Sequence, residues 1–146
     1  MEEKPTLIYL KEATRAAHCF IGKTLQERGI DDLGPQAAHI LFYLSKNKDA
    51  SSGDLREAQS SSKASVSEAL AALVDKGYIE YQSSERDRRE KRIVLTERGI
   101  EHQRRASEAI QSAVATLLNG VPPEEEERLK TTLMHIIHNA KGGEHV

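Results

Sequence analysis

The sequence predicts a mainly α-helical fold that carries one small β-hairpin. Apolar residues recur at helical spacing through most of the 146 residues, Gly and Pro mark the ends of these segments, and one short stretch alternates apolar and polar residues instead. The composition, with 38% hydrophobic and 30% charged residues and no Trp, also favours a helix-rich protein. The length corresponds to a single domain, residues 1–146.

Two helices are expected in the first third of the chain. The first spans residues 6–28 and ends at Gly29. The second begins at Pro35, which is tolerated in a first turn because its missing N–H would be unpaired there, and it stops near Asn47. Its expected inward face consists of Ala37, Ala38, Leu41 and Leu44.

Two short helices joined by a tight turn are expected next. Residues 51–54 place a serine three positions before a carboxylate, which is the pattern of a helix start. The serines at 60–62 can cap the following helix, which ends at Gly77. One face of that helix is apolar: Val66, Ala69, Leu70 and Leu73.

A hairpin and two long helices complete the chain. Residues 78–82 and 92–95 have the alternating pattern of two strands, separated by a highly polar tip. Thr96 can cap a helix that runs to about Asn119, and a last helix follows the break at residues 120–123. The longer helix carries a continuous apolar seam: Ala106, Ala109, Ile110, Ala113, Val114, Leu117 and Leu118.

Positive charge is concentrated in the hairpin tip. The net charge of −2 and the pI of about 6.3 do not by themselves indicate a nucleic-acid partner. Residues 86–92, RDRREKR, nevertheless contain five basic and two acidic residues. A basic loop directly after a helix-turn-helix can reach an adjacent minor groove or phosphates, so this segment favours DNA as the ligand.

The outer face of the helix over residues 62–76 suits the major groove of DNA. A rotation of 100° per residue places small and polar residues opposite the apolar face: Ala64, Ser67, Glu68, Ala71 and Asp75. Lys63, Ser65 and Ser67 can hydrogen-bond to base edges or phosphates. A solvated face of an ordinary amphipathic helix would look the same, and the neighbouring basic hairpin decides in favour of DNA.

Residues 63–99 resemble the recognition helix and wing of the MarR family of transcriptional regulators. The helix pattern is carried by Lys63, Val66, Ser67, Leu73 and Gly77. The wing signature, in which an Asp–Arg pair stiffens the wing and an arginine enters the minor groove, is carried by Asp87, Arg88 and Arg89, followed by Leu95, Thr96, Glu97, Arg98 and Gly99. The order of helices matches the family over almost the whole chain.

The resemblance implies a winged helix-turn-helix lobe at residues 35–96 and dimerisation helices at 6–30 and 97–141. It also implies a homodimer that binds a pseudo-palindromic operator in double-stranded DNA and represses transcription until a small aromatic or anionic effector, or an oxidant, releases it. The residues expected at the DNA are Ser51, Ser52, Ser61, Ser62, Lys63, Ser65, Ser67, Glu68, Arg86, Asp87, Arg88, Arg89 and Lys91.

Glu68 departs from the family pattern, which often has a basic residue at this position. An acid repels phosphates, although it can accept a hydrogen bond from a cytosine amino group or pair with a neighbouring cation, and either would change the preferred operator. Together with the acidic pI, Glu68 keeps open the alternative of a winged helix that binds only proteins.

The candidate effector-pocket residues are His18, Cys19 and Tyr43, which are polar groups on otherwise apolar helices. Each is also a common core or boundary residue. Cys19 allows a second alternative within the same family, a peroxide sensor whose thiolate is oxidised to a sulfenic acid, whereas free cysteine is often an inert core residue.

No metal, cofactor or enzymatic activity is expected. His135 and His138 stand three residues apart on the last helix, with Glu144 and His145 beyond, but they lack a clear complete ligand set for zinc. The sequence has no phosphate-cradling Gly-rich loop and no recognisable nucleophile motif. The sequence has no apolar run long enough to span a bilayer, and its start lacks the pattern of a signal peptide, so we expect a cytoplasmic protein.

Overall fold

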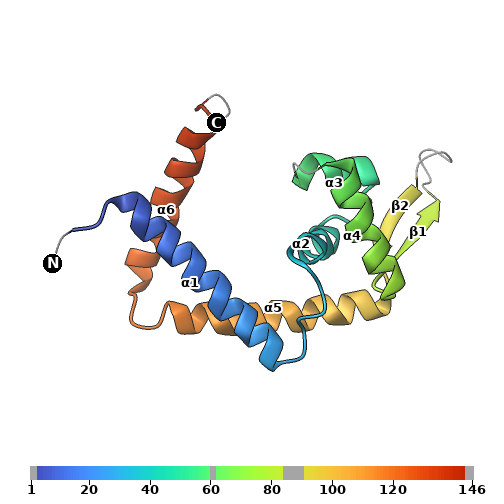
Figure 1. Cartoon of the computed structure of the whole chain (residues 1–146), viewed down its shortest axis with the longest axis horizontal. Helices are drawn as coiled ribbons and strands as arrows, with labels where there is room; N and C mark the ends of the chain where they lie inside the picture. Colours follow the sequence, from blue (N-terminus) through green and yellow to red (C-terminus); the bar gives the residue numbers. More distant parts are fainter. Residues whose placement is uncertain (1–2, 60–61, 84–90, 144–146) are drawn as a thin grey trace.

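The computed structural model describes residues 3–59, 62–83 and 91–143, and within them it confirms the mainly α-helical fold with one hairpin. The elements follow in the predicted order (Figure 1): α1 (Thr6–Glu27), α2 (Pro35–Lys46), α3 (Ser52–Gln59), α4 (Lys63–Asp75), β1 (Ile79–Ser83), β2 (Lys91–Leu95), α5 (Glu97–Leu117) and α6 (Pro123–Ala140). Their ends differ from the predicted ends by one or two residues.

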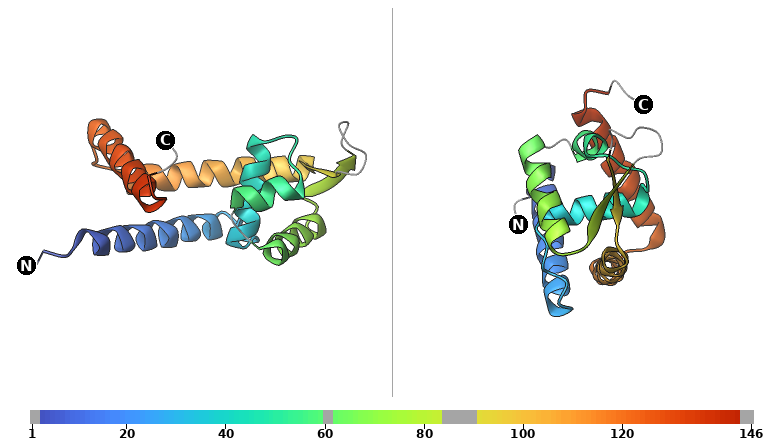
Figure 2. Two further views of the ribbon diagram at one scale, coloured as in Figure 1. Left: turned by 90° about the horizontal axis from the view of Figure 1, so that it is seen from above. Right: turned by 90° about the vertical axis from the view of Figure 1, so that its right-hand side faces the viewer.

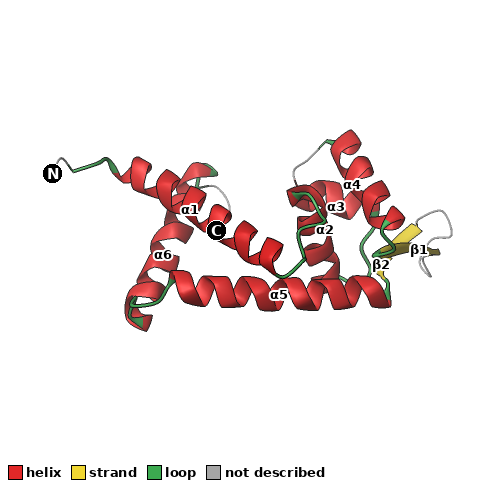
Figure 3. Ribbon diagram, turned by 60° about the horizontal axis from the view of Figure 1, so that its bottom comes forward, coloured by secondary structure: helices red, strands yellow, loops and turns green. Residues whose placement is uncertain are grey.

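The long helix α5 connects two parts of the molecule. Helices α2, α3 and α4 and the hairpin gather at its N-terminal end and form a lobe, whereas α6 follows its C-terminal end and rises away from it (Figures 1 and 2). Helix α1 packs along α5, and α2 and β2 also contact α5 (Figure 3). We call α1, α5 and α6 the arm.

The hydrophobic core lies almost entirely in the lobe. Its most deeply buried large side chains are Ile40, Leu41, Leu55, Val66, Leu73 and Ile93. The buried face of α2 is Ala37, Ile40, Leu41 and Leu44, so the prediction that Ala38 lies on this face was wrong. The observed set has the i, i+3, i+4, i+7 spacing of one helical stripe, and Ala38 lies beside it on the exposed side.

Side-chain caps fix the starts of the lobe helices. The Ser51 hydroxyl accepts from the Asp54 amide at 3.2 Å while the Ser51 amide donates to the Asp54 carboxylate at 2.9 Å, which confirms the predicted helix start. Ser62 caps α4 by accepting from the Ser65 amide at 3.1 Å. Gly77 then ends the turn after α4 with a φ of 76°, a conformation that favours glycine.

The hairpin is anchored on both sides of β2. Strands β1 and β2 are antiparallel, with Tyr81 opposite Ile93 and Ser83 opposite Lys91. On the other side of β2, Arg92 forms an isolated antiparallel β-bridge with Ser51, and the Ile93 amide donates to the Ala50 carbonyl at 2.9 Å. The base of the hairpin is therefore held by the loop between α2 and α3 as well as by β1.

The arm leaves much of its apolar surface uncovered. No residue of α1 or α6 is buried, and α6 has no extensive contact with another described element. In α5, Ala109 and Ala113 are buried, but other members of the predicted seam stay exposed. The large exposed apolar side chains of the arm include Leu7, Tyr9, Ile110, Val114, Leu129, Met134 and Ile137. None of the helices within the described ranges is long and apolar enough to cross a membrane.

Candidate nucleic-acid interface

The outer face of α4 has the predicted composition. Its exposed residues are Ala64, Ser67, Glu68, Ala71 and Asp75, while the apolar residues opposite them pack into the lobe core. Lys63 is exposed at the N-terminal end of the helix, and Ser65 is half-buried. The face is thus free of bulky side chains over its first three turns, which is what a helix needs to approach base edges.

The charge of α4 does not by itself favour DNA. Its ionisable residues are Lys63, Glu68 and Asp75, so one cation faces two anions. The N-terminus of the helix contributes a partial positive charge where Ser62 caps it, which favours a phosphate near that end. If this surface binds DNA, most of the positive charge that attracts the phosphates must come from the hairpin.

Arg92 does not add to the unpaired positive charge of the hairpin. Its guanidinium forms an ion pair with Asp49 and also donates to Gln82 Oε1 at 3.0 Å. Arg92 therefore ties β2 to the α2–α3 loop and to β1, and its charge is matched within the protein. Residues 86–91 retain four basic and two acidic side chains, and Lys91 is exposed at the start of β2.

The structure separates Ser51 and Ser52, the two serines of the predicted interface at the start of α3. Ser51, which we expected at the DNA, is only 9% exposed because its hydroxyl and amide are both used to start α3. Ser52 is half-buried at the first position of α3 and borders a shallow groove with Ser67 and Tyr81. The remaining predicted residues Ser61, Arg86, Asp87, Arg88 and Arg89 lie outside the described part of the chain.

Comparison with known proteins relates the lobe to one family. A MarR family model matches residues 31–90, the stretch that contains α2, α3, α4 and β1. This stretch of the chain is similar to the MarR family. No curated protein sequence matches it significantly.

Solved structures share the MarR winged-helix fold over almost the whole chain. The Staphylococcus aureus MepR–DNA complex has a TM-score of 0.77 and 22% identity over 94% of this chain and 99% of that one. Wild-type Escherichia coli MarR in its apo form has a TM-score of 0.72 and 17% identity over 92% and 98%. A MarR transcriptional regulator from Methanosarcina mazei Go1 has a TM-score of 0.73 and 22% identity over 92% and 94%.

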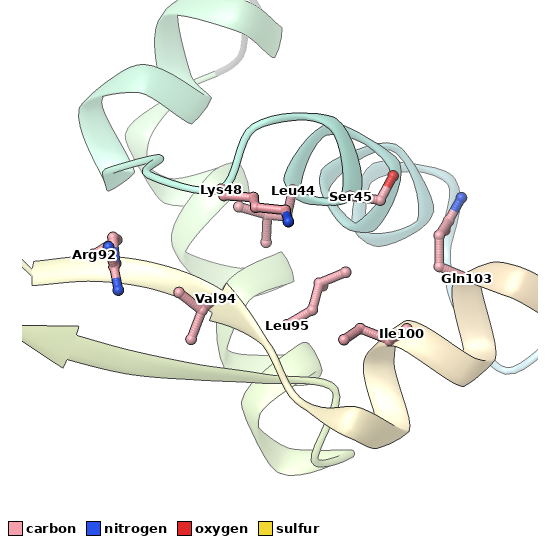
Figure 4. Close-up of a pocket in the computed structure, with 8 residues that line it drawn as sticks. All are labelled: Leu44, Ser45, Lys48, Arg92, Val94, Leu95, Ile100 and Gln103. Atoms are coloured by element: carbon pink, nitrogen blue, oxygen red, sulfur yellow. The ribbon is translucent and has the colours of Figure 1, made fainter.

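A cavity of about 540 Å³ lies where the lobe meets the arm. Figure 4 shows side chains from three segments around it: Leu44, Ser45 and Lys48 from α2 and the residues after it, Arg92, Val94 and Leu95 from β2, and Ile100 and Gln103 from α5. The volume is that of a small-molecule site, and the lining combines apolar side chains with two cations.

The residues that we expected in an effector pocket do not line this cavity. His18 and Cys19 are exposed on α1, and Tyr43 is half-buried against the lobe core. They are not among the residues that line the cavity. Residues such as Lys48 and Gln103 carry no local sequence signal, because only the fold brings their three segments together.

The histidines of α6 belong to no metal-binding cluster within the described residues. Among the described residues, no three His, Cys, Asp or Glu side chains are placed to hold a metal ion. His135 and His138 lie in that part of the chain, whereas Glu144 and His145 lie outside it.

Proposed function

We propose that this protein is a cytoplasmic, homodimeric transcriptional repressor that binds a pseudo-palindromic operator and leaves it when a small molecule binds. The observation that carries the proposal is the small, polar outer face of α4 next to a hairpin whose tip is rich in arginine. The family supports it, since the MepR relative of the same fold has been solved with DNA.

In the proposed complex α4 lies in the major groove. Lys63, Ser65, Ser67 and Glu68 face the base edges, and the N-terminus of α4 faces a phosphate. Arg86, Asp87, Arg88, Arg89 and Lys91 act from the hairpin, where arginine favours the negative potential of the minor groove. Because α4 carries a net negative charge, the hairpin supplies most of the electrostatic affinity.

The proposed dimer is built from residues 6–30 and 97–141, while residues 35–96 form the DNA-binding lobe. The arm, α1, α5 and α6, exposes more apolar surface than is usual for a monomer. Ile137 is 52% exposed on the apolar stripe of α6, which no described element covers extensively. A second copy of the chain would cover this stripe and would place two α4 helices on successive half-sites.

The dimer is tested with a charge on the α6 stripe. Ile137→Asp should lower the molecular mass measured by sedimentation at micromolar concentration from that of a dimer to that of a monomer. The reason is that dimerisation of this variant would bury an unpaired charge. The matched control is Thr131→Asp, which adds the same charge on the exposed side of the same helix. The assigned interface would be contradicted if Ile137→Asp and Thr131→Asp were both monomeric or both dimeric.

DNA binding is tested by selecting duplexes from a random pool and measuring the affinity of the selected site against salt concentration. Each lost phosphate contact should reduce the slope of log K against log salt by about 0.9. Arg88→Gln should show this reduction, whereas Arg92→Gln, whose charge is paired with Asp49, should not. Failure to select any duplex would favour the protein-binding alternative, and a footprint of one half-site at saturation would contradict the dimer.

The effector is proposed to be a small aromatic or anionic compound. The cavity between α2, β2 and α5 fits it better than the surfaces around His18, Cys19 and Tyr43, because Lys48 offers a positive charge beside apolar walls. An occupant contacts the hairpin base and the arm together, so it can change the angle between them. Lys48→Met should weaken release of DNA by aromatic carboxylates without weakening DNA binding itself.

The peroxide-sensing alternative is favoured by one observation, the exposure of the Cys19 thiol. A thiolate at the surface can be oxidised to a sulfenic acid. Peroxide should then release DNA from the wild type and not from Cys19→Ser. Equal release from both proteins would refute this mechanism and leave the small-molecule mechanism in place.

A further inference from the structure

A single carboxylate joins three segments at the junction of lobe and arm. Asp32 lies in the loop between α1 and α2. Its Oδ2 accepts a hydrogen bond of 2.7 Å from the Tyr78 hydroxyl, and its Oδ1 lies 2.9 Å from His102 Nε2. Lys76 Nζ is 3.7 Å from Oδ2. Tyr78 and Lys76 follow α4 directly and His102 belongs to α5, so Asp32 connects the end of the recognition helix to the arm.

The aromatic rings of this cluster are packed as well as hydrogen-bonded. The centroids of the Tyr78 and His102 rings are 4.5 Å apart, and the Arg98 guanidinium lies 5.5 Å from the Tyr78 ring centroid. The His102 side chain is only 10% exposed, and its Nδ1 is buried without a hydrogen-bond partner among the described residues. The Asp32 carboxylate therefore determines how the imidazole ring is oriented.

The protonation states of the cluster favour these bonds. Burial acts to raise the pKa of Asp32, but the hydrogen bonds from Tyr78 and His102 outweigh it and hold the pKa below its ordinary value. Burial and the neighbouring Asp32 raise the pKa of Tyr78. At neutral pH the carboxylate is ionised and the phenol keeps the proton that it donates.

The position of the cluster decides what it controls. Helix α4 ends at Asp75, and the chain reaches Tyr78 within three residues. Fixing Tyr78 to α5 therefore fixes the C-terminal end of α4 against the arm. In a dimer the arms are shared, so the angle between α4 and α5 sets the separation of the two recognition helices, which must match half-sites about 34–36 Å apart.

We propose that Asp32, Tyr78 and His102 form a positioning joint that sets the half-site spacing accepted by the dimer. The joint touches no DNA and acts through the orientation of α4, and it rests on the proposed DNA-binding function. If it is loosened, each lobe can still bind its half-site, but the pair of lobes no longer rejects half-sites at the wrong distance.

The test uses the full-length protein and the duplex selected by the wild type, rebuilt with its half-sites moved together or apart by one and two base pairs. Tyr78→Phe removes one hydroxyl and keeps the ring, and Asp32→Asn removes the charge. The matched control is Asp31→Asn, the same change at the exposed neighbouring residue. Affinity is measured by fluorescence anisotropy for every spacing and for a single half-site.

The joint predicts that Tyr78→Phe and Asp32→Asn reduce the ratio of best-spacing to wrong-spacing affinity at least threefold, with single half-site affinity within twofold of wild type. Asp31→Asn should keep the wild-type ratio. An unchanged ratio in Tyr78→Phe and Asp32→Asn would overturn the joint, as would an equal loss of affinity at all spacings, which indicates a merely structural role. A wild type that selects no DNA would instead refute the proposed function and with it the role of the joint.

Discussion

Gly99→Ala tests the contact between the start of α5 and the turn after α4. Gly99 is the third residue of α5, and a Cβ at this position would lie 2.0 Å from the Tyr78 carbonyl oxygen and 3.0 Å from its carbonyl carbon. Both atoms are backbone, so no side-chain rotation can relieve the clash. An ordinary contact of this kind is about 3.5 Å, so the two backbones must separate by roughly 1 Å or more.

The cost follows from the bonds that this separation breaks. The Thr96 amide donates to the Tyr78 carbonyl at 3.1 Å, and the Thr96 hydroxyl donates to the Gly77 carbonyl at 2.6 Å. Each bond contributes about 0.5–1.5 kcal/mol, and strain at the Thr96 cap adds about 1 kcal/mol. The higher helix propensity of Ala returns about 1 kcal/mol. The free energy of unfolding should therefore fall by about 2 kcal/mol, or roughly 5–8 °C in Tm.

The assay is thermal and urea unfolding followed by circular dichroism, with all proteins at one concentration because the Tm of the proposed dimer would depend on it. The matched control is Gly22→Ala in α1, where a Cβ meets nothing within 4 Å. The control should be neutral or stabilise the protein by up to about 1 kcal/mol. A Gly99→Ala protein as stable as the control would refute the argument from close approach.

Three further substitutions test the cap of α4, the charge of Asp32 and the acid on the outer face of α4. Ser62→Ala should lower the free energy of unfolding by about 1 kcal/mol in urea titrations, and Ser62→Asp should restore it, because the bond to the Ser65 amide is lost and then replaced. Folding lowers the pKa of Asp32, so the stabilisation by its carboxylate is present above the unfolded pKa and is lost as the pH falls through the folded pKa. The Tm should therefore fall less steeply between about pH 5 and pH 3 in Asp32→Asn than in wild type. Parallel curves of Tm against pH would contradict this. Glu68→Gln should raise affinity for the selected duplex several-fold at low salt, measured by anisotropy, and a loss of affinity would show instead that Glu68 accepts a hydrogen bond from a base.

The sequence predicted the elements of this fold because most of their signals are local. Pro35 starts α2, Ser62 and Thr96 cap α4 and α5, and Gly77 ends the turn after α4. The orientation of α2 was predicted less well, since Ile40 is fully buried and was not expected on the inward face. The direction of a helix stripe depends on what packs against it, and an adjacent residue such as Ala38 carries little information about this.

The candidate site divides in the same way. The exposed face of α4 could be predicted from one helix period. The pairs that support it could not, because Asp32 meets Tyr78 across 46 residues and His102 across 70. No local pattern distinguishes these side chains from ordinary surface polar residues, and only the folded chain brings them together.

The pairing of Arg92 changes how the basic hairpin is understood. The composition of residues 86–92 suggests one uniform stretch of positive charge, yet Arg92 is bound to Asp49 across 43 residues and lies between two hydrogen-bonded segments. Its function is to hold the end of β2 against the helix-turn-helix. The segment that carries the other arginines is thus fixed at Ser83 and Lys91 relative to α4. Removal of Arg92 should lower DNA affinity without lowering the salt slope, whereas removal of a phosphate-binding arginine lowers both, and this difference separates an arginine that positions the hairpin from one that binds DNA.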